Sequence, residues 1–296
     1  MFIDTWEITI SFYALLGFAF VILFAASFTL FKFVQTTPKV HRYGTLFALI
    51  VVYLAFGIIF TIQGCNQLII IYTLTAYSFN FRSTKVINAW ATMTAYFELF
   101  WVAIAGTLLA LDRVLIMLFP FKYSIWKLGR KLFVFTVALC AAIYLPALVW
   151  FAVSIPSDDK RYLNINRHLN SLQVYVTLLE TGLHVVFVLL YRKHSLSHAL
   201  TEDDKQKANQ MNQIILFLCV AQTVFCFVPI LFREFIQLKL ISALAVTLMQ
   251  KPLFAVYVLL SCIFILFKLR RKPKTVSVVT SGTSTAAKSN RTQRRK

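Results

Sequence analysis

Seven long apolar runs divide this chain, and they constrain its fold more than any other feature. A helix that crosses the hydrocarbon layer of a membrane, about 30 Å thick, needs roughly 20 consecutive apolar residues. The runs reach that length and lack the alternation of barrel strands. They cover residues 8–33, 45–72, 89–119, 132–155, 172–191, 211–232 and 241–267. We therefore predict an all-α membrane protein, with a seven-helix transmembrane bundle in residues 1–267.

The composition agrees with a membrane protein. Hydrophobic residues make up 59% of the chain and charged residues only 14%, and the mean hydropathy is +0.74. A soluble core does not need that much apolar surface. The loops between the runs are short, so we expect any ligand chemistry within the bundle or at its mouth.

The basic residues predict the orientation of the bundle, because Lys and Arg are enriched in cytoplasmic loops. With the N-terminus outside, twelve of them fall in the inner loops, seven in the outer loops and ten in the C-terminal tail. We therefore expect an external N-terminus and a cytoplasmic C-terminus. The net charge of +19 then mainly reflects membrane topology, and we expect no nucleic-acid partner.

The third run ends in a charged pair. The sequence there is Leu-Asp-Arg-Val at 111–114, followed by Phe-Pro-Phe-Lys-Tyr at 119–123. A guanidinium such as that of Arg113 stays charged and presents several donors in a rigid fork. The alternative is an interfacial anchor whose apolar stem lies in the membrane. The spacing of Pro120 and Tyr123 predicts a short structured loop after the helix.

These motifs resemble those of G-protein-coupled receptors. Asp112-Arg113 with Pro120 and Tyr123 is similar to the rhodopsin-like Asp-Arg-Tyr motif and the Pro-x-x-Tyr loop after it. The stretch Cys-Phe-Val-Pro at 226–229 is similar to the Cys-Trp-x-Pro hinge of helix six, and Lys-Pro at 251–252 stands where that family has Asn-Pro. The short N-terminus and degenerate motifs look most like the nematode serpentine chemoreceptors, and closest to the serpentine receptor gamma superfamily.

The resemblance implies a chemosensory receptor that binds a small external ligand within the bundle and activates a heterotrimeric G protein. It implies that Asp112, Arg113, Pro120 and Tyr123 take part in G-protein coupling. It also implies the plasma membrane, including that of sensory cilia, as the location. The chain departs from the family at Val114, which replaces the tyrosine of the triplet, and in lacking an aspartate in helix two.

Prolines and small residues carry structural predictions. Pro229 and Pro252 are expected hinges of helices six and seven, since a proline within a helix kinks it. Ala103, Gly106 and Ala110 place small side chains on nearly one face of helix three. We therefore expect close approach of a neighbouring helix there.

Two ionisable residues predict an ion pair within the membrane. A charge at the centre of a membrane helix costs about 2.5–3.5 kcal/mol on insertion scales, and such groups usually pair inside the bundle. Glu98 lies fourteen residues before Asp112, roughly 21 Å along a helix. The resemblance implies that Glu98 and Lys251 both lie near the mid-membrane cavity where related receptors hold a sodium ion, and we predict a salt bridge between them. The alternative is a protonated Glu98 and a Lys251 that extends to the interface.

Polar and aromatic side chains predict a ligand pocket between the helices. Glu180 and His184 are one helical turn apart and share a face of helix five. An ordinary interhelical hydrogen-bond network would explain such residues equally well. The other residues predicted to line the pocket are Tyr96, Phe97, Trp101, Gln222, Thr223 and Phe227.

The C-terminal tail, residues 268–296, is predicted to be disordered because it is basic, rich in Ser and Thr and poor in large apolar residues. Its first basic residues should contact anionic lipid of the inner leaflet. They are Lys268, Arg270, Arg271, Lys272 and Lys274. Phosphorylation of the tail would cancel positive charge and is expected either to release the tail or to recruit an arrestin-like partner; a plain solubilising tail is the alternative.

Other classes of protein have less support. The sequence contains no His-Glu-x-x-His, Gly-x-Ser-x-Gly or phosphate-loop motif, so we expect no enzyme, no cofactor and no metal. An ion-coupled transporter or channel is the alternative function, because Glu98, Glu180, His184 and Lys251 could relay ions. The chain nevertheless lacks the broken, Gly-rich helices and paired repeats of transporters.

Overall fold

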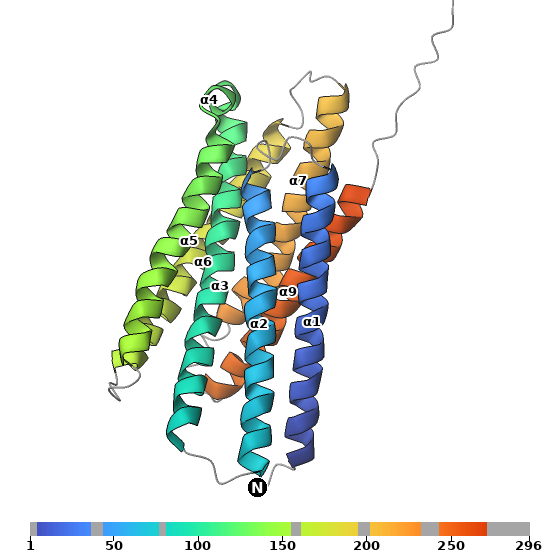
Figure 1. Ribbon diagram of the computed structural model, residues 1–296. Coiled ribbons are helices and arrows are strands. Elements are labelled where there is room, and N and C mark those ends of the chain that lie inside the picture. The colour runs from blue at the N-terminus through green and yellow to red at the C-terminus, as the bar shows by residue number, and fades with distance from the viewer. Residues whose placement is uncertain are drawn as a thin grey trace, which may run out of the picture.

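The computed structural model describes residues 5–36, 44–76, 81–154, 161–194, 202–231 and 243–270 (Figure 1). These residues are almost entirely helical, as predicted. The helices are α1 (Thr5–Thr36), α2 (Gly44–Ala76), α3 (Phe81–Leu118), α4 (Pro120–Ile125), α5 (Leu128–Ser154), α6 (Arg161–His194), α7 (Glu202–Gln222), the π-helical segment η3 (Thr223–Phe227) and α9 (Ala243–Arg270).

Seven helices in the described part of the chain are long and apolar enough to cross a membrane. Their spans coincide with the seven predicted runs, which confirms that prediction. In lipid every backbone N–H and C=O group must be satisfied within the protein, and a helix does this within its own segment. The spans are Tyr13–Thr36, Gly44–Asn66, Leu99–Leu118, Leu128–Leu145, Ser171–Lys193, Gln210–Leu231 and Pro252–Arg270.

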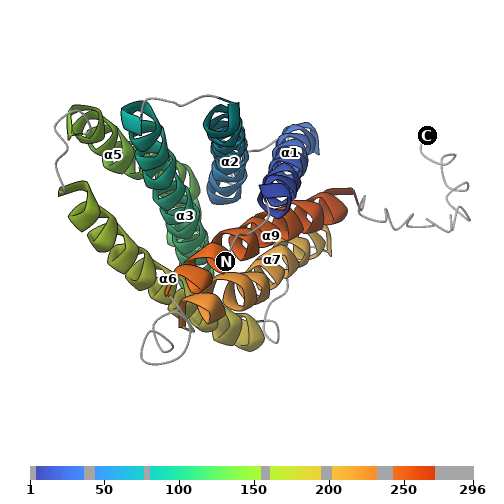
Figure 2. The same ribbon diagram turned by 90° about the horizontal axis from the view of Figure 1, so that it is seen from below.

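Helix α3 is the central element of the bundle. In the apolar segment of α3 that could cross the membrane, 72% of the residues are buried inside the protein, against 11% for α5 and 28% for α1. Helix α3 packs against α2, α5 and α6, while α9 lies beside α1 and α7 (Figure 2). The exposed faces of α1 and α5 are apolar, as lipid-facing surfaces must be. Residues on α3 are therefore the ones most able to contact several helices at once.

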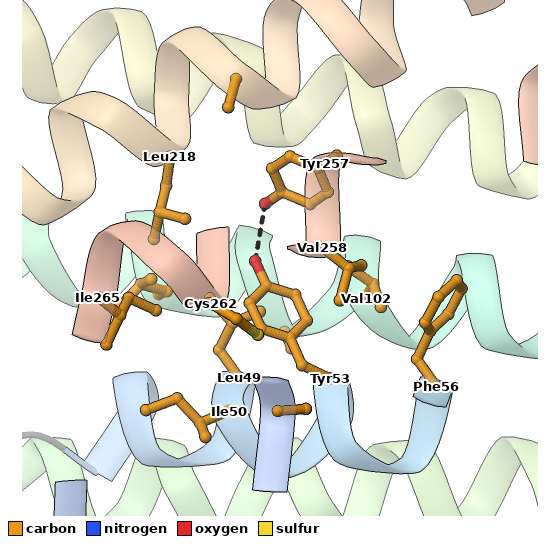
Figure 3. Close-up of a cluster of buried hydrophobic side chains, with 14 of the residues drawn as sticks. Leu49, Ile50, Tyr53, Phe56, Val102, Leu218, Tyr257, Val258, Cys262 and Ile265 are labelled. Carbon is orange, nitrogen blue, oxygen red and sulfur yellow. Dashed lines mark hydrogen bonds between the residues drawn. The ribbon is translucent and has the colours of Figure 1, made fainter. Parts of the chain in front are cut away.

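A hydrogen bond between two tyrosines lies inside the main apolar core. The hydroxyl groups of Tyr53 on α2 and Tyr257 on α9 are 3.0 Å apart, with the rings edge to face (Figure 3). This bond gives both buried phenol groups a hydrogen-bond partner in a region where most side chains are apolar. Surrounding buried side chains include Leu49, Ile50, Val102, Leu218, Val258, Cys262 and Ile265.

Two of the stretches between the predicted apolar runs are partly helical. Helix α6 begins at Arg161 and α7 at Glu202, so much of residues 156–171 and 192–210 is helix rather than linker. Adding a residue to an existing helix gains a backbone hydrogen bond at little cost, so helices extend beyond their apolar spans. Helix α9 likewise continues to Arg270, three residues past the predicted end of the bundle. The rest of the tail, residues 271–296, lies outside the described residues.

The predicted hinge at Pro229 follows a local change of helix type. Residues Thr223–Phe227 form a π-helix, and the N–H of Val228 bonds to the carbonyl of Thr223. A proline lacks an N–H and its ring clashes with the carbonyl four residues earlier, which a wider turn relieves. Residues 228–231 then continue as α-helix. Pro252, in contrast, lies inside the continuous helix α9.

Candidate functional site

The Asp112 carboxylate is held by hydrogen bonds from two other elements. The Thr45 hydroxyl, in the first turn of α2, donates to Oδ2 at 2.7 Å. The Tyr123 hydroxyl, on α4, donates to Oδ1. Asp112 is 1% exposed, so a carboxylate there requires such donors. Both oxygens of Asp112 are therefore satisfied without its neighbour Arg113.

Arg113 is buried next to that carboxylate without a full set of partners. Its Nη2 lies 3.6 Å from Oδ2 of Asp112, an ion-pair contact longer than a hydrogen bond. The side chain is 7% exposed, and Nε and Nη2 have no hydrogen-bond partner among the described residues. A guanidinium in this condition favours any partner that supplies acceptor atoms. Sequence analysis singled out this residue, and the structure brings it together with Asp112 and Tyr123.

A close helix contact positions the Thr45 donor. A Cβ atom on Gly44 would lie 2.8 Å from the carbonyl oxygen of Gly129 on α5, too close for any real side chain. Only glycine lets the first turn of α2 approach α5 so closely. Thr45, the next residue, then faces Asp112 on α3.

The connection from α3 to α5 positions the Tyr123 donor. Pro120 is the first residue of α4, a position where the missing N–H of proline costs nothing (Figure 1). The N–H of Tyr123 bonds to the carbonyl of Phe119 at 2.9 Å, which sets the turn that carries the phenol. Lys127 has a positive φ of 48°, which lets the chain turn from α4 into α5. The prediction of a short structured loop after α3 is thus confirmed.

The environment of Tyr123 keeps its hydroxyl group protonated. Burial raises the pKa of the phenol, and the Asp112 carboxylate beside it raises the pKa further because a second negative charge there would be repelled. Tyr123 is therefore a donor to Asp112 throughout the physiological range.

A second polar cluster lies within the membrane span, where α6 meets α3 and α7. Nε2 of Gln222 lies 3.3 Å from Oε2 of Glu180 and 3.3 Å from the hydroxyl of Thr181. His184 is 2% exposed and its Nδ1 has no hydrogen-bond partner among the described residues. The structure therefore brings together Glu180, His184 and Gln222, three of the residues that are predicted from the sequence to line a pocket.

The other predicted pocket residues make contacts outside this polar cluster or have side chains that the structure does not describe. The Thr223 hydroxyl bonds to the carbonyl of Cys219 in its own helix, 2.8 Å away. The Trp101 indole packs edge to face on Tyr144 of α5. Phe227 is half-buried at the end of η3. The side chains of Tyr96 and Phe97 lie outside the part of the chain whose side chains the structure describes.

The predicted ion pair also falls outside that part, because the side chains of Glu98 and Lys251 are not among the described ones. Helices α3 and α9 carry the two residues. The salt bridge between them stays a prediction.

Sequence analysis missed Thr45 and the tyrosine pair. A threonine or tyrosine in an apolar run gives no distinct signal, because both residues occur in membrane helices without special function. The partners are 67 residues apart for Thr45 and Asp112, and 204 apart for Tyr53 and Tyr257. Only the packing of the helices shows these pairs.

Neither a protein-family model nor a curated protein matches this chain. The fold itself defines the class: in its described residues the chain is an all-helical, multi-pass membrane protein with seven helices able to span the bilayer.

Proposed function

We propose that this protein is a G-protein-coupled chemosensory receptor of the plasma membrane, with its N-terminus outside. It binds a small external ligand within the bundle and activates a heterotrimeric G protein through the end of α3. The observation that carries the proposal is that Nε and Nη2 of Arg113 have no hydrogen-bond partner among the described residues. The neighbouring Asp112 carboxylate accepts hydrogen bonds from Thr45 and Tyr123 instead. The unfilled donors of Arg113 suit a protein partner that presents carbonyl or carboxylate oxygens.

The location of the site supports this reading. Arg113 lies near the end of the central helix, on the side of the bundle that carries α4 (Figure 1). With the N-terminus outside, this end faces the cytoplasm, where a G protein would bind. The π-helical segment before Pro229 gives α7 a point about which its opposite end, which begins at Glu202, can move outward.

The test is G-protein activation in cells that express the protein, measured across several Gα subunits with a panel of volatile and water-soluble small molecules. Wild type is compared with Arg113→Ala at matched surface expression. Lys131→Ala, which removes an exposed basic residue at the start of α5, is the matched control. We expect Arg113→Ala to abolish the response and Lys131→Ala to retain it.

Two results would contradict the proposal. A G-protein response that is indifferent to Arg113→Ala would make Arg113 an interfacial anchor. Ion flux through the purified protein in liposomes, without a G-protein response in cells, would favour the ion-coupled transporter or channel.

A further inference from the structure

Helix α6 buries a line of polar side chains within the membrane. Gln173, Thr177, Glu180 and His184 recur at intervals of three and four residues and therefore share one face. Each is 2–3% exposed. On the opposite face, Leu179 and Val185 are 57% and 54% exposed, as expected for contact with lipid. The polar line therefore points into the bundle and away from the lipid-facing surface.

The Glu180 carboxyl group lies directly against the main chain of α3. A Cβ atom built on Gly106 would overlap with Oε1 of Glu180 and lie 2.8 Å from its Cδ. Helix α3 therefore accommodates this carboxyl group only because residue 106 has no side chain. The close approach expected from the small residues of helix three is confirmed here, and its role is to make room for an acid.

The described groups around Glu180 provide donors and acceptors but no fixed positive charge. Gln222 donates to Oε2 at 3.3 Å. Among the described side chains, the only ion pair is the one between Arg113 and Asp112. No ionisable residue occurs on α3 between 99 and 111. Among the described side chains, the other titratable groups near Glu180 are Cys219 on α7, Cys226 on η3, Tyr257 on α9 and Tyr53 on α2.

Because Glu180 is buried and no described neighbour is a fixed cation, its carboxyl group is more stable protonated than ionised. An ionised carboxylate in the middle of the bilayer is costly unless it is paired. None of the described neighbours can pair with it except a protonated His184, whose Nδ1 has no partner. A bound proton removes the charge and leaves the carbonyl oxygen to accept from Gln222.

We propose that Glu180 is a proton-binding site within the membrane, built by Gly106, Gln222 and His184 around a carboxyl group that holds an exchangeable proton. On release, the O–H bond breaks, the proton passes to water and the bonding electrons stay on the carboxylate. The resulting charge lies in the contact between α3 and α6, so proton release weakens that contact. Such a site can exist in a receptor or a transporter alike.

The first test is infrared spectroscopy of the full-length protein in lipid nanodiscs. A protonated carboxyl group gives a C=O stretch that is separate from the bands of carboxylates and amides. We expect wild type to show this band, and expect it to shift in heavy water. Glu180→Gln should lose the band, whereas Asp112→Asn, which changes a different buried carboxyl group, should keep it. Absence of the band from wild type, or its persistence in Glu180→Gln, would overturn the proposal.

A second measurement does not depend on the folding of Glu180→Gln. Wild-type protein labelled with ¹³C at the carboxyl carbon of glutamate should show a shifted band, and Glu98→Gln should retain the band. A band that does not shift on ¹³C labelling, or that Glu98→Gln removes, would show that the proton is bound by a residue other than Glu180. Gain of the band in the double variant Lys251→Met, Glu98→Gln, with none in wild type, would mean that Glu180 is an ion-paired carboxylate and would also overturn the proposal.

The third test separates a proton from a metal cation. Thermal unfolding of wild type and Glu180→Gln is followed over pH, in sodium chloride and in choline chloride. We expect the Tm of wild type to fall as the pH is raised, because ionisation places a charge between α3 and α6, and the Tm of Glu180→Gln to fall less. A Tm that rises with sodium in wild type but not in Glu180→Gln would assign the site to sodium instead.

Discussion

Thr45 and Asp112 are joined by a hydrogen bond of 2.7 Å that connects the first turn of α2 to the last turns of α3. Together with the bond from Tyr123, it uses both oxygens of the carboxylate. The acid next to Arg113 therefore restrains the arginine through charge alone, at 3.6 Å, rather than through a shared hydrogen bond. This arrangement leaves Arg113 available to another partner.

Thr45→Val removes the hydroxyl while keeping the shape of the side chain. We expect a loss of about 1.5–3 kcal/mol in the free energy of unfolding, because a buried charged acceptor loses its donor. Thermal unfolding of the purified protein measures the change. Thr36→Val, at an exposed threonine that bonds only to its own helix, is the control and should change stability much less. Equal effects of the two substitutions would show that the bond to Asp112 contributes nothing.

Tyr123→Phe should change how stability depends on pH. In the unfolded chain a tyrosine ionises near pH 10, whereas burial and the Asp112 carboxylate raise the pKa of Tyr123 in the fold. The folded state then keeps a proton that the unfolded state has released, so the free energy of unfolding falls as the pH rises above about 10. The stability advantage of wild type over Tyr123→Phe should therefore shrink in alkaline solution.

Stability measured against pH for the two proteins tests this expectation. Tyr175→Phe, at an exposed position, is the matched control and should follow wild type. A difference between wild type and Tyr123→Phe that stays constant above pH 10, or widens, would mean that the phenol is not held as a buried donor.

The seven helices could be predicted from the sequence because lipid allows few other backbone structures. Asp112, Arg113 and Glu180 could be singled out because charged residues are rare in apolar runs. Gln222 could be grouped with Glu180 as a pocket residue, but Thr45 could not be matched to Asp112, since the two meet only through the relative rotation of helices far apart in sequence. The π-helical segment before Pro229 was also beyond prediction, because a proline indicates a distortion but not its kind.

Lys268, near the end of α9, connects that helix to the middle of α7. Its Nζ lies 2.6 Å from Oε1 of Gln213, and its carbonyl accepts from the side chain of Gln210. If the protein signals by moving this part of α7 outward, Lys268→Met should raise basal G-protein activation, because one of the two bonds is lost. Lys193→Met, at the exposed end of α6, is the control. Unchanged or lower basal activity at matched surface expression would exclude Lys268 as a restraint on α7.

Gly106 and Gly182 offer a matched pair of substitutions to alanine within the membrane. At Gly106 the new methyl group would overlap with the Glu180 carboxyl group, whereas nothing lies within 4 Å of a Cβ at Gly182. We expect Gly106→Ala to destabilise the protein by about 1–3 kcal/mol, as is usual for overpacking. Gly182→Ala should be neutral or stabilising by up to about 1 kcal/mol, because alanine is the better helix former.

Thermal unfolding of both variants gives the comparison, and infrared spectra of Gly106→Ala add a second readout. Displacement of the carboxyl group by the new methyl should move its C=O band in Gly106→Ala and leave it unchanged in Gly182→Ala. If Gly106→Ala matches Gly182→Ala in both measurements, α3 and α6 are not in close contact at this position. The acid would then lie in a looser site than the structure shows.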